Sequence, residues 1–178
     1  NWKRSTDEVG VLMRLLLEFF SSEIDELHRN RVRIRVLGDV DGLPKPQRDA
    51  AVRAMEKTKD NDGLQLNIAL NYGGRDELLR AVHKLAEAVQ GGGLEPADIT
   101  EQMLADHLDT KGQPDVDLMI RTSGEQRLSN FLLYQAAYAE FLFPDTLWPD
   151  FDIQAYHRAL SAYAMRDRRF GGRNAKGE

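Results

Sequence analysis

The sequence predicts an α/β fold in which helices flank a mostly parallel sheet within a single domain. Short apolar runs typical of strands alternate along the chain with longer segments of helical periodicity, as in consecutive β-α units. Of the 178 residues, 42% are hydrophobic and 30% are charged, which is the composition of a soluble globular protein. A chain of this length is large enough to bury one proper core.

The first helix is expected to begin at Thr6, because the segment Ser5-Thr6-Asp7-Glu8 has a hydroxyl at the cap and a carboxylate three residues later. It is expected to run to His28. Its apolar residues cover two sides instead of the single stripe of a surface helix. Either the helix is buried between the sheet and neighbouring helices or a subunit, or its second side lines a channel for a hydrocarbon chain.

Four strands are expected, at residues 31–37, 64–70, 116–120 and 141–143. The helical patterns that alternate with them cover residues 47–59, 76–90 and 100–107, the last of these with Thr100 as its cap. A last helix is expected at residues 153–168. The helix at 76–90 is expected to bury a stripe of Leu78, Leu79, Val82, Leu85, Ala86 and Val89.

The stretch around the third strand predicts an anion site. The strand stops at Arg121, a polar loop follows, and Ser129 is expected to cap an apolar helix that begins at Asn130. Arg121, Arg127 and the amides of that helix would then meet at the carboxyl end of a strand, where α/β proteins bind ligands and where guanidinium groups bind phosphate oxygens. The alternative is that both arginines pair with Glu125 and that Ser129 is only a cap.

Charge, cysteine content and hydropathy argue against several classes of protein. The net charge of -5 and the isoelectric point near 5.4 argue against a nucleic-acid partner, so a bound anion would be held by local arginines. Without cysteine the chain has no disulfide, thiolate nucleophile or cysteine metal cluster. No transmembrane segment or signal peptide is expected. The absence of a Walker or GxGxxG loop argues against a generic nucleotide-binding protein.

Four segments together resemble a known family. They are NWKR at residues 1–4, LNIALNYGGR at residues 66–75, IRTSGEQRLSNFLLYQAAYAEFLF at residues 120–143 and LWPDF at residues 147–151. Their order and spacing resemble those of the cis-prenyltransferases, the undecaprenyl diphosphate synthase family, from the first residue to about Gly172. The resemblance implies one domain at residues 1–172 and a polar tail at residues 173–178.

The resemblance also implies a six-stranded sheet whose N-terminal strands are absent from these 178 residues. The family's DGNGR-type loop, which carries an aspartate for metal binding and catalysis, is absent as well. The chain is therefore expected to be either an N-terminally incomplete enzyme or a non-catalytic partner subunit of a cis-prenyltransferase complex.

A transferase activity is what the resemblance implies. Such an enzyme condenses isopentenyl diphosphate onto an allylic diphosphate, such as farnesyl diphosphate, with cis stereochemistry to make a long-chain polyprenyl diphosphate. The resemblance further implies Mg²⁺ as cofactor, a homodimer and a cytoplasmic location. The product would be delivered to the membrane by a protein without a transmembrane segment.

Matching motif positions give the candidate residues their implied roles. Asn1 is expected to act in catalysis as proton acceptor or relay, and Glu140 to bind the metal, although a carboxylate paired to an arginine would also explain Glu140. Gln126 stands where many bacterial members have a metal-binding histidine, and Ser5 where proline is common. The residues expected to bind substrate are Trp2, Arg4, Arg121, Arg127, Leu128 and Ser129.

Two further groups of residues can each be interpreted in two ways. Phe20, Leu64 and Leu66 are either the floor of a prenyl tunnel or ordinary core residues. Residues 168–172 either resemble the family element that reaches the active site across the dimer interface, or form a charged helix end with a glycine stop.

Overall fold

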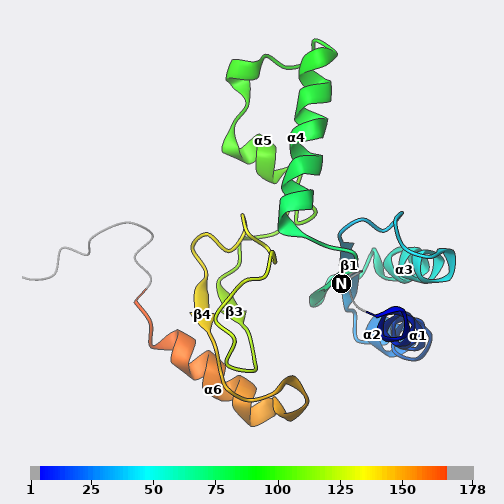
Figure 1. Ribbon diagram of the computed structural model, residues 1–178, viewed down its shortest axis with the longest axis vertical. Coiled ribbons are helices and arrows are strands. Elements are labelled where there is room, and N and C mark those ends of the chain that lie inside the picture. Colours follow the sequence, from blue (N-terminus) through cyan, green and yellow to red (C-terminus); the bar gives the residue numbers. More distant parts are fainter. Residues whose placement is uncertain (1–4, 168–178) are drawn as a thin grey trace, which may run out of the picture. The chain divides into compact units, whose positions relative to one another are not determined.

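The computed structural model describes residues 5–167 and forms two compact units, Asn1–Lys111 and Gly112–Glu178 (Figure 1). The predicted α/β class is confirmed, because both units contain helices and parallel strands. The four predicted strands are β1 (Arg33–Leu37), β2 (Gln65–Ala69), β3 (Leu118–Ile120) and β4 (Glu140–Leu142). Within residues 5–167, no helix has the length and apolar character needed to cross a membrane.

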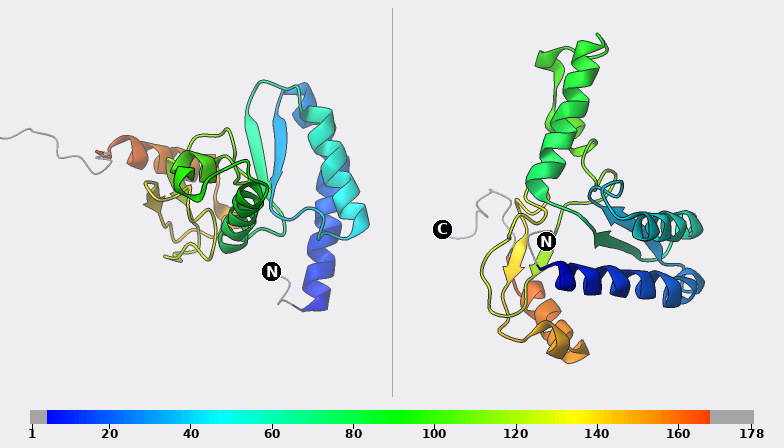
Figure 2. Two further views of the ribbon diagram at one scale, coloured as in Figure 1. Left: turned by 90° about the horizontal axis from the view of Figure 1, so that it is seen from above. Right: turned by 45° about the vertical axis from the view of Figure 1, so that its right-hand side comes forward.

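The first unit is built on β1 and β2, which pair in parallel from Arg33↔Gln65 to Leu37↔Ala69. Helices α1 (Thr6–Ser22) and α3 (Lys45–Thr58) pack together on one side of this pair (Figure 2). Alanines on the buried face of α3 leave room for the larger apolar side chains of α1 and β1. The core cluster consists of Phe20, Ile34, Val36, Ala50, Ala51 and Ala54.

The first helix is shorter than predicted. Its N-terminus is capped as expected, because the Ser5 hydroxyl accepts a hydrogen bond from the amide of Glu8 at 3.4 Å. It ends at Ser22, and a separate helix α2 (Ile24–Arg29) follows. The hydroxyls of Ser21 and Ser22 donate to the carbonyls four residues earlier, at 2.7 and 2.9 Å, a contact that bends helices and accounts for the break.

Both sides of α1 are apolar, as the sequence predicts. Phe20 is buried in the core, whereas Val11, Leu12 and Leu15 on the same helix are exposed in this chain. The exposed residues fit the second of the two interpretations, a wall for a hydrocarbon chain, but an interface would use them equally well.

Helix α4 (Gly74–Gln90) buries a face that overlaps the predicted one only in part, at Leu85. Its most buried residues are Gly74, Glu77, Ala81 and Leu85, while Leu79 and Val82 of the predicted stripe are exposed. α4 lies beside η1 (Pro96–Asp98) and α5 (Glu101–Ala105), with an apolar pocket of about 620 Å³ between them. Part of the predicted stripe therefore lines a pocket instead of a core.

The second unit is built on β3 and β4, which pair in parallel from Leu118↔Glu140 to Ile120↔Leu142. It continues through η2 (Trp148–Asp150) to α6 (Ile153–Ala164), which is capped by the Asp152 carboxylate at 2.7 Å from the amide of Ala155. The predicted helix from Asn130 is wrong: residues 128–138 form successive turns.

We expect Gly38→Ala to destabilise the protein by about 2–4 kcal/mol. Gly38 follows β1 with a φ of 114°, and a Cβ atom there would lie 2.2 Å from the carbonyl oxygen of Leu70. Gly10→Ala is the matched control, since a Cβ atom in this part of α1 meets nothing within 4 Å. Urea unfolding should show the control unchanged or stabilised by up to about 1 kcal/mol. Equal effects in both variants would contradict this account of Gly38.

Candidate active site

The loop after β3 is held by backbone hydrogen bonds to the segment after β4. The amides of Arg121, Ser123 and Gly124 donate to the carbonyls of Leu142, Thr146 and Pro144, each at 2.9 Å. Ser123 and Gly124 have φ values of 74° and 66°, so the chain turns sharply directly after the strand. The loop is therefore fixed at the carboxyl end of β3, where the sequence predicted the anion site.

Arg121 lies across the inside of this loop. One guanidinium nitrogen donates to the Arg127 carbonyl at 2.5 Å and to the Ser129 hydroxyl at 2.9 Å. The other donates to the Glu125 carboxylate at 3.0 Å. The side chain is only 29% exposed, so Arg121 both closes the loop and places a positive charge at its centre.

Arg127 forms an ion pair with the same oxygen of Glu125, and its side chain is 62% exposed. Two guanidinium groups thus converge on one carboxylate oxygen and leave one positive charge in excess. The arginines pair with Glu125, as the alternative interpretation expects, and they also meet at one point, which a site for an anion would require. A phosphate group carries more charge and more acceptor oxygens than a carboxylate. It could therefore replace the Glu125 carboxylate between the two guanidinium groups.

Ser129 is not a helix cap. Its φ is 48°, and Asn130 and Leu132 are also in the left-handed region, with φ values of 67° and 44°. A right-handed helix cannot pass through three such residues, so the expected row of N-terminal amides is absent here. The site depends on guanidinium groups and on the Ser129 hydroxyl instead.

The remaining members of the loop differ in exposure. Leu128 is half-buried, and its carbonyl accepts a hydrogen bond from the amide of Phe131 at 3.1 Å. Gln126 is exposed. Leu128 therefore shapes the loop backbone, whereas Gln126 faces away from the packed part of it.

Glu140 begins β4 and is bound by an arginine. Its carboxylate accepts from Arg166 at 2.5 Å, and Arg166 also donates to the carbonyl of Phe141 at 2.9 Å. This is the arginine-paired carboxylate that the sequence left open as an alternative to a metal ligand.

Known proteins resemble this chain over almost its whole length. A family model for undecaprenyl diphosphate synthase matches residues 1–171. The chain belongs to the undecaprenyl diphosphate synthase family. An isoprenyl transferase from Clostridium perfringens is 53% identical over 172 residues, covering 97% of this chain and 68% of that protein. A farnesyl-diphosphate-specific ditrans,polycis-undecaprenyl-diphosphate synthase from Photorhabdus laumondii is 47% identical with the same coverage.

Solved structures of the family share this fold. Lavandulyl diphosphate synthase from Lavandula x intermedia, crystallised with dimethylallyl diphosphate, superposes with a TM-score of 0.93 at 39% identity, covering 96% of this chain and 74% of that one. A probable undecaprenyl diphosphate synthase from Campylobacter jejuni gives 0.85 at 37% identity, covering 96% and 78%. The α/β fold predicted from the sequence is thus the family fold.

Residues 5–167 do not by themselves fit a protein-held Mg²⁺ site. Within them no group of three or more histidine, aspartate or glutamate side chains is placed to hold a metal ion. Glu140 is a single carboxylate and is engaged by Arg166. A metal ion in this family member would therefore have to take ligands from diphosphate oxygens or from residues outside this range.

The remaining predictions concern the two ends of the chain and the residues of the expected prenyl tunnel. Asn1, Trp2, Arg4 and residues 168–172 lie outside the described residues. Of the tunnel candidates, Phe20 is buried in the core of the first unit, Leu64 is exposed and Leu66 is half-buried. None of these three lines the apolar pocket beside α4.

Proposed function

We propose that this chain performs the family's prenyl transfer, condensing isopentenyl diphosphate onto an allylic diphosphate such as farnesyl diphosphate with cis stereochemistry. The product would be a long-chain polyprenyl diphosphate. Support comes from relatives named isoprenyl transferase and undecaprenyl diphosphate synthase. The observation on which the proposal depends is the convergence of Arg121 and Arg127 on one anionic oxygen at the end of β3.

The two arginines have different tasks in this proposal. Arg121 is anchored to the Arg127 carbonyl and the Ser129 hydroxyl, so it offers a charge that is already oriented before the substrate binds. Arg127 is exposed and touches Glu125 by a surface ion pair, which contributes only about 0–1 kcal/mol. Exchanging Glu125 for a diphosphate should therefore cost little and add bidentate hydrogen bonds.

The chemistry makes further demands on the protein. The allylic C–O bond breaks as the isopentenyl double bond attacks, the diphosphate leaves, and a proton is lost from the new cation. We assign to Asn1 the role of proton acceptor or relay. Substrate contacts are assigned to Trp2, Arg4, Leu128 and Ser129. These roles rest on the motif positions, and substitution of each residue tests them.

Mg²⁺, a homodimer and a cytoplasmic location belong to the same proposal. Within residues 5–167 Glu140 is a single carboxylate that Arg166 engages, so these residues should hold Mg²⁺ tightly only together with a diphosphate. Calorimetry of the 178-residue chain should detect no tight Mg²⁺ binding alone and clear binding in the presence of inorganic pyrophosphate. Tight binding of Mg²⁺ without pyrophosphate would contradict this expectation.

The activity is tested with the intact protein, labelled isopentenyl diphosphate, farnesyl diphosphate and Mg²⁺, followed by sizing of the lipid products. Long polyprenyl diphosphates are expected, and excess EDTA should abolish them until Mg²⁺ is restored. A folded wild-type protein that makes no product under these conditions would refute the proposed function.

A further inference from the structure

Glu125 occupies the point at which the two arginines of the candidate active site meet. Its oxygen Oε2 accepts a hydrogen bond from Arg121 at 3.0 Å and forms the ion pair with Arg127. The residue follows Ser123 and Gly124, whose φ values of 74° and 66° turn the chain directly after β3. The loop itself therefore supplies an anion to the place where the proposed function puts a diphosphate.

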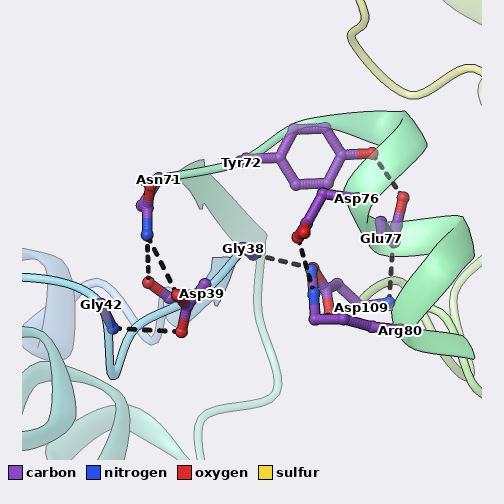
Figure 3. Close-up of polar contacts among 9 residues, drawn as sticks. All are labelled: Gly38, Asp39, Gly42, Asn71, Tyr72, Asp76, Glu77, Arg80 and Asp109. Atoms are coloured by element: carbon purple, nitrogen blue, oxygen red, sulfur yellow. Dashed lines mark hydrogen bonds and ion pairs between the residues drawn. The ribbon is translucent and has the colours of Figure 1, made fainter. Parts of the chain in front are cut away.

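A permanent ion pair in this protein has a different geometry. In the first unit Asp109 binds both terminal nitrogens of Arg80, at 2.9 and 2.8 Å, and also accepts from the amide of Gly38 at 2.8 Å (Figure 3). Its side chain is 14% exposed. Burial raises the pKa of Asp109, but the hydrogen bond and charge of Arg80 and the Gly38 amide outweigh it, so the pKa lies below its ordinary value. Another anion could replace this carboxylate only by breaking all of these hydrogen bonds.

The contact of Glu125 with the two arginines lacks these features. The Glu125 side chain is 37% exposed and the Arg127 side chain 62%, and ion pairs of this exposure contribute little to stability. Arg121 has a separate anchor, because its other terminal nitrogen donates to the Arg127 carbonyl and to the Ser129 hydroxyl. Glu125 can therefore leave the arginines while the loop keeps its shape.

Prenyl transfer requires that the diphosphate at this site be released repeatedly. The allylic diphosphate leaves when the new C–C bond forms, so the lengthened chain carries the diphosphate that arrived with isopentenyl diphosphate. That diphosphate must leave Arg121 and Arg127 before the next isopentenyl diphosphate can bind there. Two guanidinium groups without a competing anion would hold it tightly and slow every further addition.

We propose that Glu125 is an internal competitor of the diphosphate. It reduces the positive charge of the empty site, is displaced when a diphosphate binds, and returns to the arginines as the diphosphate leaves. The inference rests on the proposed prenyl transfer. It adds to that function a residue that sets how tightly the site holds its substrate and how fast it releases the lengthened chain.

Calorimetry with inorganic pyrophosphate measures this competition directly. Glu125→Gln keeps the size of the side chain and one acceptor oxygen but removes the negative charge. We expect pyrophosphate to bind this variant about five- to tenfold more tightly than the wild type, without Mg²⁺ and at low salt. Glu95→Gln is the matched control, because Glu95 is exposed in the first unit and its substitution changes the net charge equally. The control should match the wild type.

Steady-state kinetics of the intact protein should show the same competition during the reaction. Glu125→Gln should lower KM for isopentenyl diphosphate and should also lower kcat, because the lengthened diphosphate is released more slowly. A residue that only holds the loop together would instead raise KM when it is replaced.

The outcomes separate this inference from the proposed function. Pyrophosphate binding that is unchanged, weaker or absent in Glu125→Gln would overturn the competition, even if the wild type makes long polyprenyl diphosphates. Tighter pyrophosphate binding in a protein whose wild type makes no product would refute the prenyl transfer alone and leave Glu125 as the competitor at an anion site. Should Glu125→Gln not fold, Glu125→Asp decides by the same measurement, because its shorter side chain reaches the arginines less closely and should also tighten binding.

Discussion

Arg121→Ala is expected to lower kcat/KM for isopentenyl diphosphate by about 100-fold or more. The reason is that truncating one partner of a largely buried, hydrogen-bonded charge pair costs about 2–5 kcal/mol. The variant loses a charge to which the proposed function assigns the binding of the diphosphate. It also loses the contacts that close the loop, to the Arg127 carbonyl and the Ser129 hydroxyl. Steady-state kinetics with varied isopentenyl diphosphate measures the effect.

Two companion variants separate charge from geometry. Arg121→Lys keeps the positive charge but lacks the planar fork, so it should recover only part of the loss. Arg127→Ala should weaken isopentenyl diphosphate use strongly with no change in unfolding temperature, because this exposed side chain contacts Glu125 only by an ion pair. An unchanged KM and turnover in Arg121→Ala would remove this loop from the substrate site.

Signals in the local sequence were sufficient to predict the strands and two helix caps. Ser5 and Thr100 cap their helices as predicted, with Thr100 accepting from the amide of Met103 at 3.2 Å. The β3 run ends at Arg121 as expected, because a short apolar segment followed by polar residues encodes both the strand and its end. Such signals depend on neighbours within a few residues.

The helix predicted from Asn130 failed because a distant contact decides its backbone. The amide of Val116 donates to the carbonyl of Gln135 at 3.0 Å, which ties residues 128–138 to the segment before β3. The apolar residues there fit a helical pattern equally well, and nothing in the local sequence requires left-handed conformations at Ser129, Asn130 and Leu132.

The burial of Glu77 was missed for a related reason. A glutamate in an amphipathic helix is normally solvent-exposed, so the sequence places it on the polar face. Its burial depends on the Tyr72 hydroxyl and on the Asp109 amide, which lies 32 residues away. The available signal was its spacing of four and eight residues from Ala81 and Leu85, the two most buried apolar positions of α4.

Asp109→Asn is expected to lower the free energy of unfolding at pH 7 by about 2–4 kcal/mol, somewhat less than for a fully buried pair because Arg80 is partly exposed. An asparagine cannot accept from Arg80 on both side-chain atoms while also accepting from the Gly38 amide. Thermal unfolding should show a midpoint lower by about 5–12 °C for a domain of this size.

The pH dependence of this difference identifies its cause. Because folding lowers the pKa of Asp109, its contribution is fully present above the unfolded value of about 3.9 and is lost as pH falls through the lower folded value. The gap between wild type and Asp109→Asn should therefore be constant from pH 7 to 5 and close below about pH 4. Asp62→Asn is the matched control, because Asp62 pairs with Arg31 on the surface and its removal should leave unfolding nearly unchanged. A gap that stays the same down to pH 3 would mean that asparagine perturbs the packing and that the Arg80 charge pair is not the source of the stability.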